Sequence, residues 1–347
     1  MIYNLQLLRA FAAISVVVLH VTSNAGLNLN AGVGGYGVDL FFVISGFTMT
    51  YIGRGPAATF FLRRCIRIIP LYWAATIGTF VVSWVSPGLV ESAAASFPHL
   101  LHSLAFIPFP NRLGVMQPTL ALGWTLNYEM YFYALFTLGL LVTPRHAAIV
   151  ASGLVVAATL LIRIVGVNDK AITFYSDPIV FEFIFGIFTY YAVNALTAVE
   201  LRSGVLSKRA TLFAIAAIAV IPILLQEKLL PDSRVLCAGL PSALLVFSLV
   251  VIETKYHMPR SAKPLGILGD ASYVLYLTHP FVVYGAIRLF LRPAQMSSLA
   301  LALATLGLTL LAIIVAVTIH FYLESPLLEF LRRRLTPCRA SPVPVAT

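Results

Sequence analysis

The sequence predicts an all-α membrane protein, a polytopic bundle of about ten transmembrane helices. Of its 347 residues, 60% are hydrophobic and only 10% are charged, whereas a soluble domain carries about 25% charged residues. Apolar segments near the length that a bilayer requires recur along the chain, and the basic residues fall mainly in alternate loops. We therefore expect one membrane domain over residues 1–330, followed by a basic, proline-rich tail over 331–347.

The apolar segments and the charged residues between them place the spans. In chain order these are 4–24, 37–54, 68–87, 118–142, 147–165, 176–196, 210–226, 235–253, 269–291 and 298–322. The first resembles a signal peptide superficially, but it holds Arg9 within its apolar core and has no basic segment ahead of it, so we expect a retained span. With Met1 in the cytoplasm, about twice as many Lys and Arg residues lie inside as outside, which predicts cytoplasmic termini.

The first span carries two ionisable residues, Arg9 and His20, which lie eleven residues apart. At about 100° per residue, this spacing returns a helix to nearly the same face, and the two side chains lie roughly 16 Å apart along the axis. Ionisable side chains are costly at membrane depth and are usually functional there. The pair indicates a pathway through the protein, with a cation near its start and an imidazole near its end.

Asp39 begins the second span, directly after the glycine-rich segment 32–37. We expect these glycines to form a turn that lets two spans cross closely. His20 and Asp39 would then approach each other, and a carboxylate beside an imidazole raises its basicity and fixes its tautomer, as a general base requires. The alternative is an interfacial histidine and an aspartate that caps a helix start.

Arg64 and Arg67 lie at the mouth of the third span, three residues apart, and so share a helix face. With Arg9 they would clamp phosphate groups, for which the guanidinium fork is well shaped. The alternative is the ordinary excess of positive charge in cytoplasmic segments.

Two carboxylates, Glu129 in the fourth span and Glu182 in the sixth, have no cation near them in the sequence. Each therefore needs a tertiary partner or a proton. The alternative for both is a hydrogen bond between helices. Glu129 lies within the aromatic segment 124–133, which also contains Trp124 and Tyr133.

The ninth span contains Tyr276, His279 and Pro280. Because proline frees backbone groups, a kinked helix with an imidazole at mid-depth would line a cavity. A packed core histidine is the alternative. The long loop 88–117 is predicted to lie outside, either beside an acceptor site or as a surface or re-entrant loop.

Taken together, these segments resemble the acyltransferase 3 family of integral membrane acyltransferases over roughly residues 4–330. The residues that carry the resemblance are the Arg9-to-His20 spacing, Gly37–Phe47, Arg64–Tyr72, Trp124–Tyr133, Ser272–Pro280 and Tyr322–Leu327. The opening Tyr3–Ala10 resembles the exopolysaccharide-production branch. The chain departs from the family at Thr125, where serine is common, and at Met130, where a second acidic residue is usual.

The resemblance implies a multi-pass protein of the bacterial inner membrane that takes acyl-CoA, by default acetyl-CoA, from the cytoplasm. The acceptor would be a hydroxyl of a polysaccharide or a lipid-linked oligosaccharide, and we expect neither a metal nor a nucleic-acid partner. His20 is implied as catalytic base or acyl carrier, and Arg9 as a residue near the donor. The full set of candidates is His20, Asp39 and Glu129 for catalysis, Arg9, Arg64, Arg67 and Tyr72 for the donor, and Trp124, Tyr133, Glu182, Tyr276 and His279 for the acceptor.

The resulting hypothesis is that acyl-CoA docks its phosphates on the arginines and threads its pantetheine arm along the first helix. His20, oriented by Asp39, would then deprotonate the acceptor hydroxyl, or would itself carry the acyl group. A succinyl donor would need a further cation, which Arg288 or Arg292 would supply. A transporter or flippase for a polysaccharide precursor is the competing class, and it predicts repeats and broken helices, which the sequence lacks. A non-catalytic sensor is a third alternative.

Overall fold

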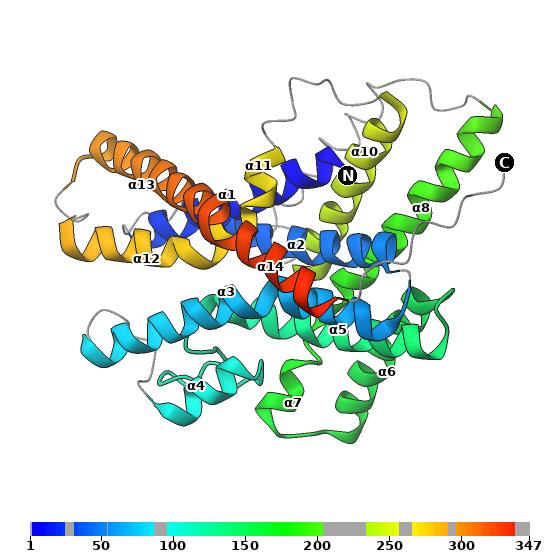
Figure 1. Cartoon of the computed structure of the whole chain (residues 1–347), viewed down its shortest axis with the longest axis horizontal. Helices are drawn as coiled ribbons and strands as arrows, with labels where there is room; N and C mark the ends of the chain where they lie inside the picture. The colour runs from blue at the N-terminus through cyan, green and yellow to red at the C-terminus, as the bar shows by residue number, and fades with distance from the viewer. Residues whose placement is uncertain are drawn as a thin grey trace.

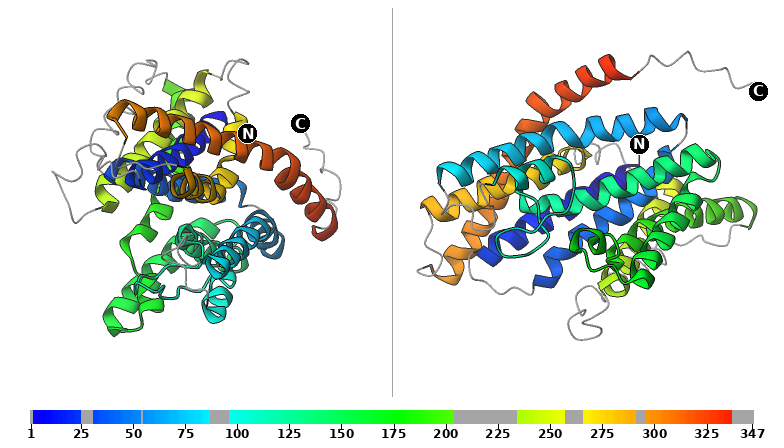
Figure 2. Two further views of the ribbon diagram at one scale, coloured as in Figure 1. Left: turned by 90° about the vertical axis from the view of Figure 1, so that its left-hand side faces the viewer. Right: turned by 90° about the horizontal axis from the view of Figure 1, so that it is seen from below.

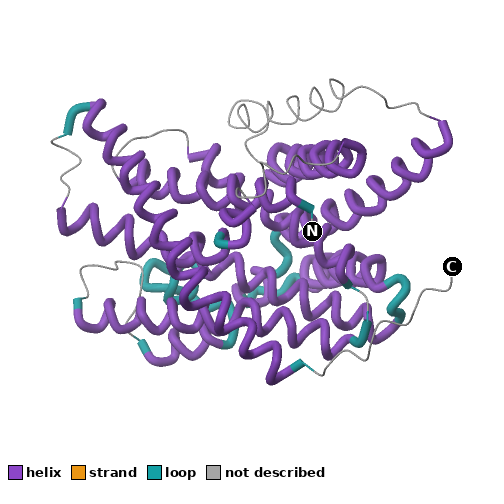
Figure 3. Tube along the Cα trace, turned by 45° about the horizontal axis from the view of Figure 1, so that its top comes forward, coloured by secondary structure: helices purple, strands orange, loops and turns teal. Residues whose placement is uncertain are grey.

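The structure is a computed structural model that describes residues 2–24, 31–53, 55–86, 96–203, 234–256, 266–290 and 296–336. Over these ranges the chain is a bundle of helices without a strand (Figures 1 and 3). Only an isolated bridge between Pro110 and Met116 departs from helix and loop in the described ranges. The predicted all-α class is therefore confirmed.

The longer helices are α1 (Tyr3–Asn24), α2 (Ala31–Ile52), α3 (Ala57–Val85), α5 (Trp124–Val142), α6 (Ala147–Val165), α8 (Phe181–Ser203), α10 (Leu240–Tyr256), α12 (Ser272–Phe290), α13 (Ser298–Ile319) and α14 (Ser325–Leu335). The shorter helices are α4 (Phe97–Leu104), α7 (Lys170–Phe174) and α11 (Gly266–Asp270). Two 3₁₀ turns, η1 (Ala121–Gly123) and η2 (Pro178–Val180), and two π-helical turns, η3 (Val235–Gly239) and η6 (His320–Glu324), join or extend them.

Seven helical segments of the described chain are long and apolar enough to cross a membrane. Together with α5 and α12, they correspond to the predicted spans apart from 210–226, which lies outside the described residues. The protein is therefore a multi-pass membrane protein.

Several predicted boundaries are wrong. The second helix starts at residue 31 rather than 37, so the segment 32–37 is helical and not a turn. The third starts at residue 57 rather than 68, because the long arginine side chains can lie on a helix near its end and still extend their charges toward water. The last span continues through η6 and α14 to residue 335 rather than ending at 322, and the domain boundary at 330 stays a prediction. Residues 337–347 of the expected tail lie outside the described residues.

Helix α1 lies at the centre of the bundle, in contact with α2, α10, α11, α12 and α13. Small residues allow its closest approach to α2: a Cβ atom on Gly37 would stand 2.4 Å from the backbone oxygen of Ala12. The glycine therefore permits the close crossing expected from the sequence, but it does so within a helix. The position of α1 explains how one helix can present ionisable residues to sites formed by many others.

Helices α2 and α8 pack with their backbones almost in contact. A Cβ atom on Gly46 would stand 2.0 Å from the carbonyl oxygen of Phe183, and one on Gly186 would stand 2.0 Å from that of Val43. Such small-residue contacts are typical of membrane helices, where close van der Waals packing replaces the hydrophobic effect. This contact fixes α2 against the bundle.

Figure 2 shows α3, α4, α5, α6 and α7 gathered as one group beside the group that contains α1, α12 and α13. In the same views, α14 projects from the side of the bundle. The candidate site residues lie on α1, α2, α3, α5, α8 and α12.

Candidate functional site: two cavities along the first helix

Two cavities lie along α1, one at each of its ionisable residues. The first, which we call the Arg9 cavity, has a volume of about 100 Å³ and is lined by residues of α1, α2, α3, α5 and α12. The second, the His20 cavity, has a volume of about 440 Å³ and is lined by α1, α3, α12 and the segment 117–124. Both ionisable residues of the first helix therefore face open space within the bundle.

The Arg9 cavity gathers three guanidinium groups. Arg64 and Arg67 lie one turn apart on α3, and Arg9 joins them from α1. Within the described part of the chain, the buried Nε of Arg64 and Nη2 of Arg67 have no hydrogen-bond partner. An unpaired buried donor costs about 1–3 kcal/mol and more when it is charged, so this arrangement is suited to a bound anion.

Glu129 of α5 is a carboxylate of the same cavity. Its Oε1 accepts hydrogen bonds from Ser45 Oγ at 3.1 Å and from the Tyr133 hydroxyl. Its charge also acts on Arg9 and Arg64. The tertiary partners that the sequence requires for Glu129 are thus present, and Tyr133 lies with this cluster rather than with the acceptor residues among which it was expected.

Positive charge exceeds negative charge around the Arg9 cavity. Arg9 interacts electrostatically with Asp270 of α11 as well as with Glu129 and Arg67. Arg332 of α14 adds a further positive charge that interacts with Arg67. The two carboxylates do not neutralise all of the guanidinium groups, which leaves a site for an anion of more than one charge.

The His20 cavity is larger and less charged. Its lining combines the aromatic rings of Trp124 and Tyr284, the side chain of Gln117 and the guanidinium of Arg288. Aromatic faces with a few polar groups are typical of sites that bind small polar molecules. Trp124, one of the residues predicted to bind the acceptor, lines this cavity.

Part of the wall of the His20 cavity comes from the segment that follows α4. His99 of α4 is buried, and its Nε2 donates a hydrogen bond to the carbonyl of Gln117 at 2.9 Å. Ser103 Oγ accepts a hydrogen bond from the backbone N–H of Thr119 at 2.8 Å. Burial lowers the pKa of His99, and the neighbouring His102 lowers it further. The predicted external loop is thus ordered against the cavity over the part that the structure describes.

His20 meets a second imidazole rather than a carboxylate. Its Nδ1 lies 2.7 Å from Nε2 of His279, and the two rings lie edge to edge, nearly parallel at 15°, with centroids 5.0 Å apart. His279 is fully buried and does not line the cavity, so it contacts His20 on the side away from the cavity. The structure brings the two histidines of the first and ninth predicted spans together, although their sequence separation gave no sign of it.

The two cavities share a boundary. Tyr276 and Thr125 line the Arg9 cavity, and their hydroxyl groups lie 2.9 Å apart. Both also donate to the carbonyl of Leu122, a residue that lines the His20 cavity, at 3.2 Å and 3.1 Å respectively. A small polar partition therefore separates two spaces on one side of α1.

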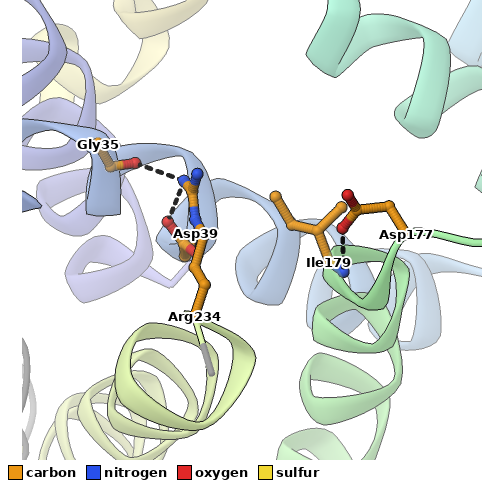
Figure 4. Close-up of polar contacts among 5 residues, drawn as sticks. All are labelled: Gly35, Asp39, Asp177, Ile179 and Arg234. Carbon is orange, nitrogen blue, oxygen red and sulfur yellow. Dashed lines mark hydrogen bonds and ion pairs between the residues drawn. The ribbon is translucent and has the colours of Figure 1, made fainter. Parts of the chain in front are cut away.

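The predicted contact between Asp39 and His20 is wrong, because Asp39 pairs with Arg234 and His20 with His279. The Asp39 carboxylate is fully buried and forms a bidentate ion pair with Arg234, whose Nε and Nη2 donate at 2.9 Å and 2.8 Å (Figure 4). Arg234 also donates to the backbone oxygen of Gly35. Asp39 thus ties α2 to the start of η3, because it lies on the face of α2 that α8 and η3 cover.

Glu182 lies with this ion pair and not with either cavity. It is fully buried on α8 and interacts electrostatically with Asp39 and Arg234. Its Cγ would be 2.9 Å from a Cβ atom on Gly239 of the π-helical turn η3. Asp177, which caps η2 by accepting from the N–H of Ile179, is a further carboxylate near Arg234 (Figure 4). The expected acceptor role of Glu182 has no support from this position.

Tyr72 also lies apart from the Arg9 cavity. It is fully buried, its ring packs on Phe106 with centroids 4.8 Å apart, and its hydroxyl donates to the Ser103 carbonyl at 3.0 Å. Tyr72 therefore anchors the segment after α3, and its expected role in donor binding has no support from this position. The direction of its helix places it about a turn and a half beyond Arg67.

Sequence reasoning missed several residues of these sites. Arg234 was only a loop cation, because its partner lies almost two hundred positions earlier. Ser45 carried no signal of its own within Gly37–Phe47, yet its hydroxyl donates to Glu129. Gln117 carried no signal in the sequence. Tyr284 lies five residues after His279 on an apolar helix, which is a spacing without a motif.

In the described residues, no group of three or more His, Cys, Asp or Glu side chains is placed to hold a metal ion. The chemistry of the two cavities is that of guanidinium, carboxylate, hydroxyl and imidazole groups.

The chain is similar in sequence to several known proteins. The chain is 33% identical over 309 residues to the exopolysaccharide production protein ExoZ of Rhizobium meliloti. The aligned region covers 87% of this chain and 92% of ExoZ. The chain is 26% identical to the acyltransferase MdmB of Streptomyces mycarofaciens, over 97% of this chain and 94% of that protein. It is 25% identical to the peptidoglycan O-acetyltransferase OatA of Listeria monocytogenes, over 78% of this chain and 48% of that longer protein.

No solved structure matches the chain. The acyltransferase domain family matches residues 2–321, which include both cavities. A match over nearly the whole chain, with the relative ExoZ at 33% identity, leads to one conclusion: the chain belongs to the acyltransferase 3 family of membrane acyltransferases.

Proposed function

We propose that the protein transfers an acyl group, by default acetyl, from cytoplasmic acyl-CoA to a hydroxyl of an extracytoplasmic or lipid-linked polysaccharide in the bacterial inner membrane. The observation that carries this proposal is the pair of adjoining cavities along α1, one rich in guanidinium groups and one with an imidazole at its wall. One cavity has the chemistry to hold the donor, and the other has the chemistry to activate the acceptor.

The Arg9 cavity fits the phosphates of a coenzyme A thioester. Buried nitrogens of Arg64 and Arg67 lack partners in the described structure, and guanidinium groups bind phosphate oxygens through paired hydrogen bonds. Arg332 of α14 extends this group of positive charges, because it interacts electrostatically with Arg67. On this assignment the Arg9 end of α1 is cytoplasmic, in agreement with the charge distribution of the loops.

The His20 cavity fits a sugar hydroxyl at the imidazole. In direct transfer, the hydroxyl oxygen bonds to the thioester carbonyl carbon while His20 takes the hydroxyl proton, and the C–S bond breaks to release coenzyme A as a thiolate that is then protonated. In the stepwise route, His20 first carries the acyl group and then yields it to the sugar. Both routes need the thioester to cross the partition formed by Tyr276 and Thr125.

The acceptor class rests on the relatives. ExoZ is an exopolysaccharide production protein and OatA a peptidoglycan O-acetyltransferase, and both names point to bacterial polysaccharides. Trp124 and Tyr284 offer rings on which a sugar face can pack. Arg288 in the same cavity would suit a carboxylate, either on an acidic sugar or on a succinyl group.

The test is mass spectrometry of surface polysaccharide from a strain that lacks the gene and is complemented with wild type, His20→Ala or His146→Ala. His146 is exposed beyond α5 and serves as the matched control. Wild type and the control variant should restore one acyl mass, which also identifies the group, and His20→Ala should not.

The same three proteins, purified in detergent, should be compared for release of free thiol from acetyl-CoA. A transporter would release none with any of them, and the polysaccharide of the deletion strain would then keep its acyl groups. Full activity of His20→Ala in both assays would exclude His20 as base or acyl carrier.

A further inference from the structure

The two imidazoles at the His20 cavity form a chain of hydrogen bonds with a defined direction. His279 Nδ1 lies 3.0 Å from the backbone oxygen of Leu275, and His279 Nε2 lies 2.7 Å from Nδ1 of His20. The other ring nitrogen of His20, Nε2, takes no part in this series of hydrogen bonds, and His20 lines the cavity. Each link restricts where the protons of the next ring can be.

The direction follows from the carbonyl at the start of the chain. A carbonyl oxygen can only accept, so Nδ1 of His279 must carry a proton. No carboxylate in the described structure hydrogen-bonds to either ring, and an imidazolium would be a buried charge without a partner there. With the pair neutral, Nε2 of His279 is an acceptor and Nδ1–H of His20 donates to it. The lone pair of His20 is then on Nε2.

Pro280 strengthens the first link. In a regular helix the N–H at position 280 would donate to the carbonyl of Tyr276, but proline has no N–H. That carbonyl is therefore free, and it too interacts with the His279 imidazole. The sequence His279-Pro280 thus provides two backbone acceptors for one ring N–H, which gives His279 a fixed tautomer even though the ring is fully buried.

We propose that His279 is a positioning residue that holds His20 in the tautomer with a proton on Nδ1 and the lone pair on Nε2. The inference rests on the proposed function, in which His20 takes the proton of the acceptor hydroxyl, and it names Nε2 as the atom that takes it. When His20 becomes an imidazolium, its Nδ1–H still donates to a neutral acceptor at 2.7 Å. The role is that of the orienting group in a nucleophile–base–orienter arrangement, performed by a neutral imidazole.

The kinetic test compares His279→Gln with His279→Leu. Glutamine can present an acceptor near the position of Nε2, whereas leucine fills similar space without one. We expect His279→Leu to lower kcat for transfer by about 100-fold while the KM for acetyl-CoA changes less than about threefold, in line with losses when an orienting partner is removed. His279→Gln should retain kcat within about tenfold of wild type. Wild-type kcat in His279→Leu would overturn the proposal.

The spectroscopic test reads the protonation state of the ring in wild type and does not depend on activity. In wild type labelled with ¹⁵N-histidine, the His20 signals, identified by their loss in His20→Ala, should show a protonated Nδ1 and an unprotonated Nε2. A protonated Nε2 on His20 in wild type would overturn the tautomer assignment. If His20→Ala is fully active, the proposed function fails, and the tautomer measurement still decides whether His279 sets the ring state.

Discussion

The two cavities along α1 solve different problems with different chemistry. The Arg9 cavity holds several cations with buried nitrogens that lack partners, and Glu129 offsets only part of their charge. The His20 cavity is more than four times larger and has at its wall the imidazole of His20, which is hydrogen-bonded to the buried His279. Charge therefore dominates binding at one end, whereas the direction of a hydrogen bond dominates at the other. Substitutions in the first should change KM for the donor, and those in the second should change kcat or the KM for the acceptor.

The largest effect expected from this comparison is on donor affinity. Replacing Arg64 and Arg67 together with Gln should raise the KM for acetyl-CoA by about 100-fold or more, because a charged hydrogen bond contributes about 1.5–3 kcal/mol. The measurement is initial rates against acetyl-CoA concentration, with Arg145→Gln, an exposed site beyond α5, as the control.

A short donor sharpens the same prediction. S-acetyl-N-acetylcysteamine has the thioester but no phosphates, so wild type and the Arg64 and Arg67 double variant should use it with similar kcat/KM. An equal loss with both donors would mean that the arginines act on the thioester or on the fold instead of on phosphate.

Arg288 offers a smaller test at the other cavity. Arg288→Gln should raise the KM for the acceptor by about tenfold where the acceptor or the acyl group carries a carboxylate, while the KM for acetyl-CoA stays near its wild-type value. Arg288→Lys keeps a charge at the site and should recover part of the loss. A neutral sugar acceptor used equally well by all three proteins would assign the residue to acidic substrates, and a change in donor KM would contradict the separation of the cavities.

Asp39 distinguishes the arrangement predicted from the sequence from the one in the structure. Because it pairs with Arg234, Asp39→Asn should lower the unfolding temperature by several degrees. The double variant Asp39→Asn, Arg234→Gln should lose less than the sum of the single variants, as expected for residues in contact. The pH profile of kcat should keep its midpoint. A shifted midpoint would mean that Asp39 acts on His20 after all.

The features that the sequence predicted best are those that depend on neighbouring residues along the chain. The length and apolarity of the spans predicted the helices, and the eleven-residue spacing placed Arg9 and His20 on one side of α1, where both reach cavities. Arg64 and Arg67 share a face because they lie one turn apart, and the structure puts that face at the Arg9 cavity. Periodicity in one helix is a local property, so it survives folding.

The partners of the ionisable residues could not be predicted, because they depend on contacts between distant segments. Asp39 was paired with the nearest histidine, yet its cation is Arg234, which approaches from a helix whose position only tertiary packing decides. Tyr72 follows Arg64 and Arg67 in the chain, but it lies on another face of the helix and packs on Phe106. The link between His20 and His279 joins residues 259 positions apart in the sequence, so no local pattern predicts it.

The smallest predicted effect concerns the ordered wall of the His20 cavity. Burial lowers the pKa of His99 below its ordinary value of 6.5. The unfolded chain therefore binds a proton at His99 before the folded protein does, so stability is fully present above about pH 6.5 and is lost as the pH falls through the lower folded-state pKa. The unfolding temperature in detergent should fall by a few degrees more between pH 7.5 and pH 5 in wild type than in His99→Gln. Glutamine can still donate to the Gln117 carbonyl, which His99 Nε2 reaches at 2.9 Å, but it does not titrate. Identical pH dependence in the two proteins would place the acid sensitivity elsewhere and would leave the wall of the cavity indifferent to protonation.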